Sequence, residues 1–182
     1  LALMFQHHPE TSRPERFRGP ADTWLWPTLA PSDVQDAVDL LENQYWTEGV
    51  SREVLAKAQL GASAWLGARD ARGRLVATAR ANSDGARHAY VADVAIAPEY
   101  RGRGLGQALV RLLLDHPNVR GAGFVRLATR DAQPFYERFG FEPEQEVQFA
   151  FPMARLLLRR SGVPVSVDAR AHGAPQPALG AT

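Results

Sequence analysis

Residues 90–114 read YVADVAIAPEYRGRGLGQALVRLLL, and three structural patterns follow one another within this stretch. From Tyr90 to Ala97 the residues form the two alternating rows of a period-two pattern, which predicts a buried strand. Pro98 ends that strand, because proline lacks the N–H group that a ladder requires. After a glycine-rich segment, apolar residues recur every three or four positions as far as Leu113 and predict an amphipathic helix. The stretch therefore predicts a strand, a loop and a helix.

The loop between them, RGRGLG at 101–106, has the composition of a phosphate-binding turn. Its glycines let backbone amides turn toward one point, and the helix that follows favours an anion at its N-terminus. Arg101 and Arg103 add forked donors that suit phosphate oxygens. No Lys-Ser or Lys-Thr follows the last glycine, and the G-x-G-x-G spacing differs from the dinucleotide fingerprint. From the loop alone, a solvated turn between two core elements stays an open alternative.

Residues 96–106, IAPEYRGRGLG, resemble the acyl-CoA-binding signature of the GNAT (GCN5-related) N-acetyltransferases. In that family an apolar strand end and a proline precede R/Q-x-x-G-x-G/A at the start of a helix. A second block, LATRDA at 127–132 followed by FYERFGF at 135–141, is similar to the family's late segment. It departs from the family where Asp131 replaces the asparagine often seen before the helix. The resemblance covers about Trp24 to Met153.

The predicted elements agree with the fold that this resemblance implies. It is an α/β fold (α+β mixed sheet), the GNAT acyl-CoA N-acyltransferase fold, with a central mixed sheet flanked by helices. We expect an N-terminal extension at 1–21, an acetyltransferase domain at 22–157 and a loosely held tail at 158–182. The expected elements are a strand at 23–29, a helix from 31 to about 45 capped by Ser32, a helix from Ser51 to about 60 ended by Gly61, strands at 64–68, 74–80 and 124–129, a short helix capped by Asp131, and closing strands at 141 and 146–151.

Composition limits the classes of function that the chain can have. Its 182 residues carry a net charge of +1, which argues against a protein that binds nucleic acid along a basic face. There is no cysteine, so disulfides and thiol catalysis are excluded. We expect no metal, because the adjacent His7 and His8 fit a surface pair better than a ligand set. No run approaches a membrane span and the N-terminus is a poor signal peptide, so we expect a cytoplasmic protein with no membrane partner.

The resemblance implies acetyl-CoA as cosubstrate and gives each part of the loop region a role. The loop amides would hold the pyrophosphate of coenzyme A, and the strand before the loop would splay from its neighbour and bind the pantetheine arm. An amide near Ala95 or Ile96 would then face the thioester oxygen. The expected cofactor-binding residues are Val94, Ala95, Ile96, Arg101, Gly102, Arg103, Gly104, Leu105, Gly106 and Asp131.

Two residues are candidates for catalysis, Tyr136 and Asp93. By the resemblance, Tyr136 would protonate the leaving thiolate, although its helical spacing with Phe135 and Phe139 also fits core packing. Asp93 is a lone acid within an apolar strand, where it costs free energy unless it is solvated or paired. It could be a general base, a contact for a cationic substrate, or the structural partner of an arginine such as Arg80.

The resemblance implies an acetyl-CoA-dependent N-acetyltransferase. Such an enzyme would move an acetyl group to a primary amine of an unidentified small-molecule or peptide acceptor, by direct attack in a ternary complex. One alternative is a non-catalytic acyl-CoA-binding regulatory module of the same fold, and another is a nucleotide-binding protein of a different kind. Tyr45 and Trp46 could line the acceptor pocket or pack against the sheet. A homodimer contact through the N-terminal segment also stays open.

Overall fold

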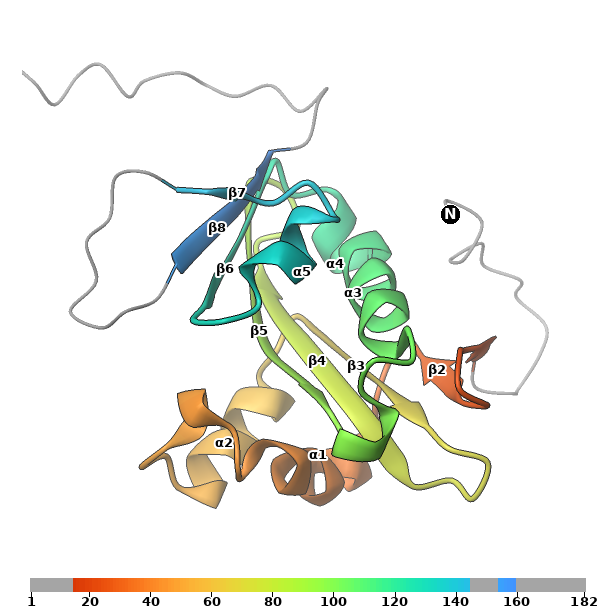
Figure 1. Ribbon diagram of the computed structural model, residues 1–182. Helices are drawn as coiled ribbons and strands as arrows, with labels where there is room; N and C mark the ends of the chain where they lie inside the picture. The colour runs from red at the N-terminus through yellow and green to blue at the C-terminus, as the bar shows by residue number, and fades with distance from the viewer. Residues whose placement is uncertain (1–14, 145–153, 160–182) are drawn as a thin grey trace, which may run out of the picture.

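The computed structural model describes residues 15–144 and 154–159. Within these residues one mixed sheet runs through the molecule in the order β1-β2-β3-β4-β5-β6-β8-β7 (Figure 1). Neighbouring strands are antiparallel except for β5 and β6, which are parallel. The strands are β1 Phe17–Arg18, β2 Trp24–Trp26, β3 Ala64–Arg69, β4 Leu75–Ser83, β5 His88–Ile96, β6 Phe124–Thr129, β7 Glu142–Pro143 and β8 Ala154–Arg159. The predicted α/β fold with a central mixed sheet is confirmed.

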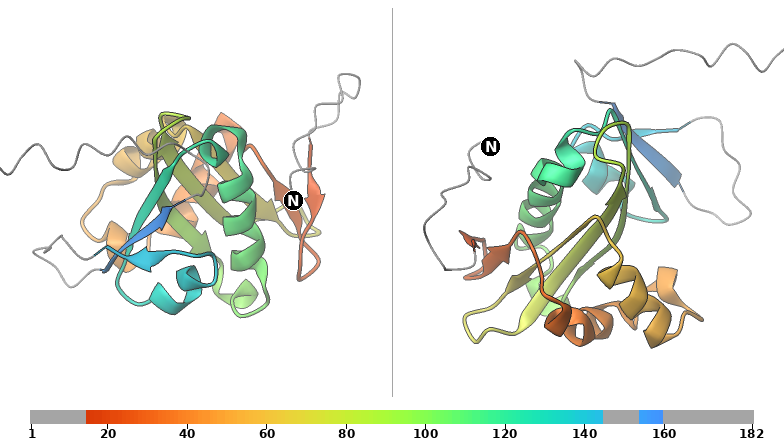
Figure 2. Two further views of the ribbon diagram at one scale, coloured as in Figure 1. Left: turned by 90° about the horizontal axis from the view of Figure 1, so that it is seen from above. Right: turned by 180° about the vertical axis from the view of Figure 1, so that it is seen from behind.

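Helices cover both faces of this sheet, with α3 on one face and α1 and α2 on the other (Figure 2). Helix α3 packs on β3, β4 and β5 through a row of fully buried leucines, including Leu105, Leu109 and Leu112. The amphipathic pattern of α3 is explained by this packing, because its apolar face is buried against the sheet. The helices are α1 Val34–Leu41, α2 Arg52–Leu60, α3 Leu105–Asp115, α4 Pro117–Arg120 and α5 Gln133–Glu137, with 3-10 turns η2 Pro31–Asp33, η3 Tyr45–Thr47 and η4 Pro98–Tyr100.

Strands β5 and β6 part halfway along their length. Their parallel pairing joins His88–Tyr90 to Phe124–Arg126 and then stops, although β5 continues to Ile96 and β6 to Thr129. Figure 1 shows the two strands diverging toward the glycine loop and α5. Beyond Tyr90, the side of β5 turned to β6 has no strand partner among the described residues. The splayed strand that the resemblance implied is present.

A β-bulge accompanies this parting on the other side of β5. Thr78 of β4 pairs with Ala95 and Arg80 pairs with Ala92, so two residues of β5 lie opposite one residue of β4. Asp93 is one of the two and has φ 52°, in the left-handed region that non-glycine residues rarely adopt. A bulge of this kind re-aims side chains and increases the local twist. The acid is therefore held at an irregularity in the strand.

Two helix starts were predicted from serine caps, and one of the predictions is wrong. The hydroxyl of Ser51 caps α2 by accepting a hydrogen bond from the N–H of Val54 at 3.4 Å, as expected. Ser32, in contrast, caps nothing, because the chain enters a 3-10 turn at Pro31 first. There the carboxylate of Asp33 accepts from the N–H of Ala30 at 2.9 Å. A carboxylate at the third position of a helical turn commonly accepts from the N–H of the residue that precedes the turn.

The predicted cap at Asp131 is also wrong. The hydroxyl of Thr129 accepts from the N–H of Ala132 at 3.1 Å, so the residue at the end of β6 satisfies the free donor before α5. The side chain of Asp131 lies instead 3.9 Å from the guanidinium of Arg130. Serine and threonine readily bond a backbone N–H a few residues onward, which explains the outcome.

Several element ends differ from the expected ones. The first helix ends at Leu41, since the chain turns at Gln44 and the hydroxyl of Thr47 donates to the Gln44 carbonyl at 2.9 Å. The strand expected at 23–29 stops at Trp26, before a proline. Strand β1 lies within the segment expected to be an N-terminal extension, and β8 continues to Arg159, past the expected domain end at 157. Some predictions lie outside the described residues, namely the strand at 146–151, the pair His7 and His8, and most of both terminal segments. The domain limits at 21 and 157 stay predictions.

Candidate active site

Two adjoining cavities lie where β5 and β6 part. The larger one, of about 790 Å³, is bordered by the glycine loop, the end of β5 and α5, and is called the large cavity below. The smaller one, of about 210 Å³, lies between the middle of β5 and the end of β6, and is called the small cavity. They share the lining residues Tyr45, Trp46, Val94, Asp131, Ala132 and Tyr136. A molecule bound in one cavity would therefore meet a molecule bound in the other.

The glycine loop forms the end wall of the large cavity. Gly102 and Gly104 have φ of 70° and 83°, a conformation that strains any residue with a Cβ. Gly104 precedes the first turn of α3, which has no side-chain cap, so the free N–H groups of that turn are available to a ligand. The Nε of Arg101 donates to the carbonyl of Ile96 at 3.0 Å and fixes the loop against the end of β5. This geometry suits an anion such as a diphosphate.

Most of the expected cofactor-binding residues border this one cavity, and two do not. Those that line it are Val94, Ala95, Ile96, Arg101, Gly102, Gly104, Gly106 and Asp131. Arg103 points elsewhere, with its guanidinium 5.7 Å from the centre of the Tyr100 ring. Leu105 is fully buried in the core, so only its backbone could reach a ligand. The structure thus brings the loop and the end of β5 together, while the roles of the individual residues stay predictions.

Tyr136 lies on α5 at the boundary of the two cavities. It is 8% exposed, and its ring makes edge contacts with Phe135 and Phe141, at 5.0 and 5.9 Å between ring centres. Burial, followed by the nearby phenol of Tyr45, raises the pKa of Tyr136 well above its usual value. The hydroxyl therefore keeps its proton at all ordinary pH values. Core packing and access to both cavities are combined in this one residue.

Asp93 is held by two donors from different elements. Its Oδ2 accepts from the Nε of Arg80 on β4 at 2.6 Å and from the Nε2 of Gln59 on α2 at 2.9 Å. The side chains of Arg80 and Asp93 are only 14% and 10% exposed, so this is a largely buried ion pair. Of the three roles left open for Asp93, the pairing with Arg80 is present in the structure. Because Asp93 also lines the small cavity, pairing does not remove it from the site.

Gln59 is a site residue that sequence reasoning missed. It is 1% exposed and its Oε1 is buried without a hydrogen-bond partner. A signal was present, since Gln59 follows the buried Leu55 by four positions and so lies on the inward face of its helix. A polar residue at such a position needs a polar partner inside the protein. Here that partner is Asp93.

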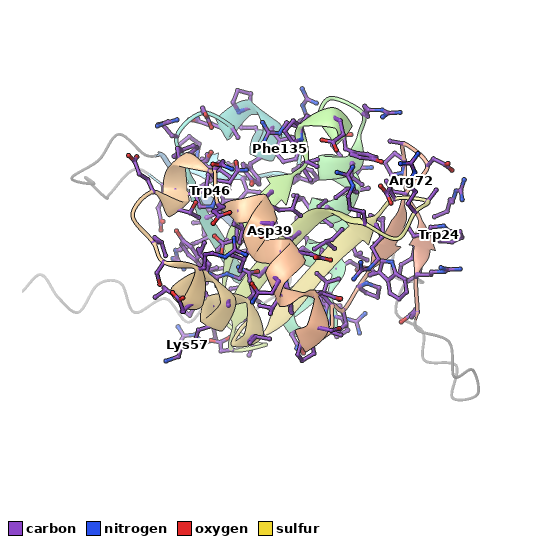
Figure 3. The ribbon with its side chains drawn as sticks, turned by 90° about the horizontal axis from the view of Figure 1, so that it is seen from below. Trp24, Asp39, Trp46, Lys57, Arg72 and Phe135 are labelled. Carbon is purple, nitrogen blue, oxygen red and sulfur yellow. The ribbon has the colours of Figure 1, made fainter. Side chains whose placement is uncertain are left out.

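Tyr45 and Trp46 line both cavities, and Trp46 also packs against a core cluster that includes Ala95 of β5, so the two expected roles are combined. The Tyr45 hydroxyl accepts from the N–H of Arg130 at 2.9 Å, and the Arg130 guanidinium lies 3.8 Å from the ring centre. The Trp46 ring packs edge-on against Tyr45, with the ring centres 4.9 Å apart. Seen from below, Trp46 lies on η3, at the opposite end of the molecule from Trp24 (Figure 3). The early turn η3 and the segment after β6 thus enclose the site together.

The charged side chains differ between the two cavities. Arg101, Arg130 and Arg138 line the large cavity alone, Asp93 lines the small cavity alone, and Asp131 lines both. Within residues 15–144 and 154–159, no three His, Asp or Glu side chains come together as metal ligands. Among the helices of those residues, none has the length and apolar character needed to cross a membrane.

Comparisons of sequence assign the chain to known relatives. The model of the acetyltransferase (GNAT) family matches residues 22–141. The chain is 42% identical over 74 residues to GCN5-related N-acetyltransferase 2, chloroplastic, of Arabidopsis thaliana, covering 40% of this chain and 29% of that protein. It is 40% identical over 74 residues to histone acetyltransferase TAP1 of Glycine max, covering 40% and 32%. The matched region is therefore about a third or less of these two relatives.

Comparisons of structure agree with this assignment. A GNAT-family acetyltransferase structure from Xanthomonas campestris pv. campestris is 30% identical, with a TM-score of 0.60, covering 74% of this chain and 96% of that one. A Mycobacterium tuberculosis structure in complex with CoA has a TM-score of 0.62 at 17% identity, covering 75% and 98%. The second likeness is one of fold alone.

Proposed function

Because this chain belongs to the GNAT acetyltransferase family, we propose that it moves an acetyl group from acetyl-CoA to the primary amine of an acceptor. The proposal includes direct attack in a ternary complex, with no covalent enzyme intermediate. One observation supports it most, namely two adjoining cavities of different charge with a protonated phenol, Tyr136, at their boundary. Two substrates that are bound side by side can react directly, without a covalent intermediate on the protein.

The large cavity would hold the acyl donor. Its uncapped helix N-terminus and the left-handed Gly102 and Gly104 fit a diphosphate, since a Cβ at Gly102 would project into space with no protein atom within 4 Å. Arg101 adds charge at the same wall. The unpaired side of β5 from Val94 to Ile96 offers backbone groups to an amide-bearing arm, as in a β-strand addition. The resemblance and the shape of the cavity thus agree on the donor.

The transfer step needs a proton removed at one substrate and a proton supplied at the other. An amine that has lost its proton forms a C–N bond with the thioester carbonyl, and the C–S bond then breaks. A backbone N–H near Ala95 or Ile96 would stabilise the oxyanion, and the Tyr136 hydroxyl would give its proton to the departing thiolate. Solvent then restores the phenol. Asp93, directly or through water, would take the proton of the amine.

The experiment that tests the proposal measures turnover and binding separately. Thiol release from acetyl-CoA would be followed with a panel of small amines and lysine peptides, while calorimetry measures CoA binding alongside ATP and NAD. We expect CoA to bind in preference to both nucleotides and at least one amine class to be acetylated. CoA binding with no turnover on any acceptor would favour the regulatory module, and preference for ATP or NAD would overturn the donor assignment.

A further inference from the structure

The small cavity has a lining that is unusually one-sided in charge. Its carboxylates, Asp93 and Asp131, lie among aromatic residues, and none of the described residues that line it is an arginine, lysine or histidine. Carboxylates accept hydrogen bonds and aromatic rings attract cations, whereas a substrate carboxylate would find no basic partner here. The aromatic residues are Tyr45, Trp46, Tyr90 and Tyr136.

Asp93 presents one oxygen in a fixed direction. Gln59 and Arg80 both donate to Oδ2, at 2.9 and 2.6 Å, from α2 and β4. The other oxygen, Oδ1, has no hydrogen-bond partner among the residues that the structure describes, and the residue borders the cavity. The bulge at φ 52° fixes the backbone beneath it. A carboxylate anchored by one oxygen and open at the other is well suited to hold an ammonium group.

The large cavity provides the contrast. Three arginines line it, Arg101, Arg130 and Arg138, and the predicted phosphates of the donor would neutralise them. An acceptor that carried a carboxylate would therefore meet no basic side chain in its own cavity and would face phosphates in the next one. Electrostatic arrangements of this kind select partners by excluding the wrong charge as much as by binding the right one.

We propose that the acceptor is a cationic amine with no carboxylate near the nitrogen that is acetylated. This inference rests on the proposed function and narrows its substrate class. A free diamine and a lysine side chain in a basic or neutral peptide both have this chemistry, and the experiment must distinguish these two sources. Amines that carry an acidic group close to the acetylated nitrogen, such as the α-amino group of an amino acid, are excluded.

The first test compares acceptors that differ mainly in charge, and the neutral and acidic members of each series have almost the same shape. The small-molecule arm uses diaminopropane, β-alaninamide and β-alanine, and the peptide arm uses one free lysine followed by arginine, asparagine or aspartate. Rates are corrected for the fraction of unprotonated amine. In the arm that contains the true acceptor, we expect kcat/KM to be at least about tenfold lower for the acidic member than for the neutral one, and highest for the cationic one.

Outcomes of this comparison separate the two proposals. Equal rates across a charge series, or faster acetylation of its acidic member, would overturn the inference and leave the acetyltransferase assignment in place. Acetylation of no member of either series, in a protein that binds acetyl-CoA, would overturn both. Activity confined to one arm identifies whether the acceptor is a small amine or a peptide.

The second test removes one carboxylate of the cavity. Asp131→Asn should reduce the preference for neutral over acidic acceptors by several-fold, since it keeps the side-chain shape and removes the charge. Asp39→Asn is the matched control, because the Asp39 side chain is 63% exposed against 64% for Asp131, is also ion-paired, and lies on α1 outside both cavities (Figure 3). An unchanged preference in Asp131→Asn, or an equal change in both variants, would contradict the proposal.

Discussion

The phenolic oxygen of Tyr45 accepts a hydrogen bond from the backbone N–H of Arg130 at 2.9 Å, across 85 positions of sequence. The guanidinium of Arg130 lies over the same ring, 3.8 Å from its centre. Both residues border the large cavity, so this pair fixes the distance between the early turn η3 and the segment that follows β6. The width of the site depends on a contact between two otherwise separate parts of the chain.

The change Tyr45→Phe removes that hydrogen bond and keeps the ring. We expect the KM values for acetyl-CoA and for the acceptor to rise several-fold, because η3 is less firmly placed. The free energy of unfolding should fall by only about 1 kcal/mol, the usual net value of one hydrogen bond. Steady-state kinetics and thermal unfolding measure the two effects. Tyr100→Phe, on η4 outside both cavities, should change neither KM, and unchanged KM values in Tyr45→Phe would contradict the role given to the pair.

Replacing Tyr136 with Phe should separate catalysis from binding. The phenyl ring preserves the packing against Phe135 and Phe141, while the proton donor is lost. We expect kcat to fall at least about a hundredfold, the low end for a general acid, with the Kd for CoA nearly unchanged. Single-turnover rates and calorimetry measure these quantities. A variant with wild-type kcat would return Tyr136 to interior packing alone.

The pH profile of kcat provides an independent test of the same residue. Burial raises the pKa of Tyr136 above its ordinary value near 10.0, and a raised phenol pKa extends the protonated form to higher pH. The rate should therefore show no loss of the acid group between pH about 8 and 10. Kinetics across this range, in wild type and in Tyr136→Phe, would reveal it. A decline in that window that is absent from the variant would show that the phenol titrates normally and that this account is wrong.

Two glycines offer a matched test of the loop. Gly102 and Gly73 have φ of 70° and 84°, and a Cβ built on either meets no atom within 4 Å. Alanine at each should therefore cost a similar amount of stability, about 1–2 kcal/mol for the left-handed backbone. Only Gly102 borders the large cavity, so only Gly102→Ala should weaken CoA binding, by tenfold or more. Equal CoA affinity in the two variants would argue that the diphosphate binds elsewhere.

The buried pair of Arg80 and Asp93 should stabilise the protein far more than an exposed pair. Arg80→Met leaves the carboxylate with Gln59 alone, and we expect the free energy of unfolding to fall by about 3 kcal/mol. A double-mutant cycle with Asp93→Asn should show strong coupling. The pair Arg52–Asp39, with side chains 41% and 63% exposed, is the control and should give a much smaller loss, because solvent screens exposed charges. Similar losses for both pairs would mean that Asp93 is better solvated than its burial indicates.

Local sequence patterns predicted those parts of the site whose residues lie close together in the sequence. The strand, loop and helix from Tyr90 to Leu113 could be predicted because each depends on neighbouring residues, through spacing and backbone freedom. The same holds for the cap at Ser51. The predicted caps at Ser32 and Asp131 are absent, because a nearby residue, Asp33 or Thr129, provides the oxygen that accepts from the backbone there.

Contacts between distant segments could not be predicted in this way. Gln59 and Asp93 are 34 positions apart, and the hydrogen bond between them depends on the bulge in β5 and on how α2 lies across the sheet. The pairing of Arg80 with Asp93 could be named as one alternative because the two residues lie on strands expected to be neighbours. The enclosure of the site by Tyr45 and Arg130 depends on where β6 leaves its partner, which no local pattern records.

The early end of the pairing between β5 and β6 gives the protein a built-in reporter. Beyond Tyr90, the backbone N–H groups of β5 that face β6 have no strand partner among the described residues, so we expect their hydrogens to exchange quickly with deuterated water. A bound molecule that bonds to them would slow that exchange at a few identifiable positions. Occupancy of the site could then be followed amide by amide, without a substrate that turns over and without a label on the ligand.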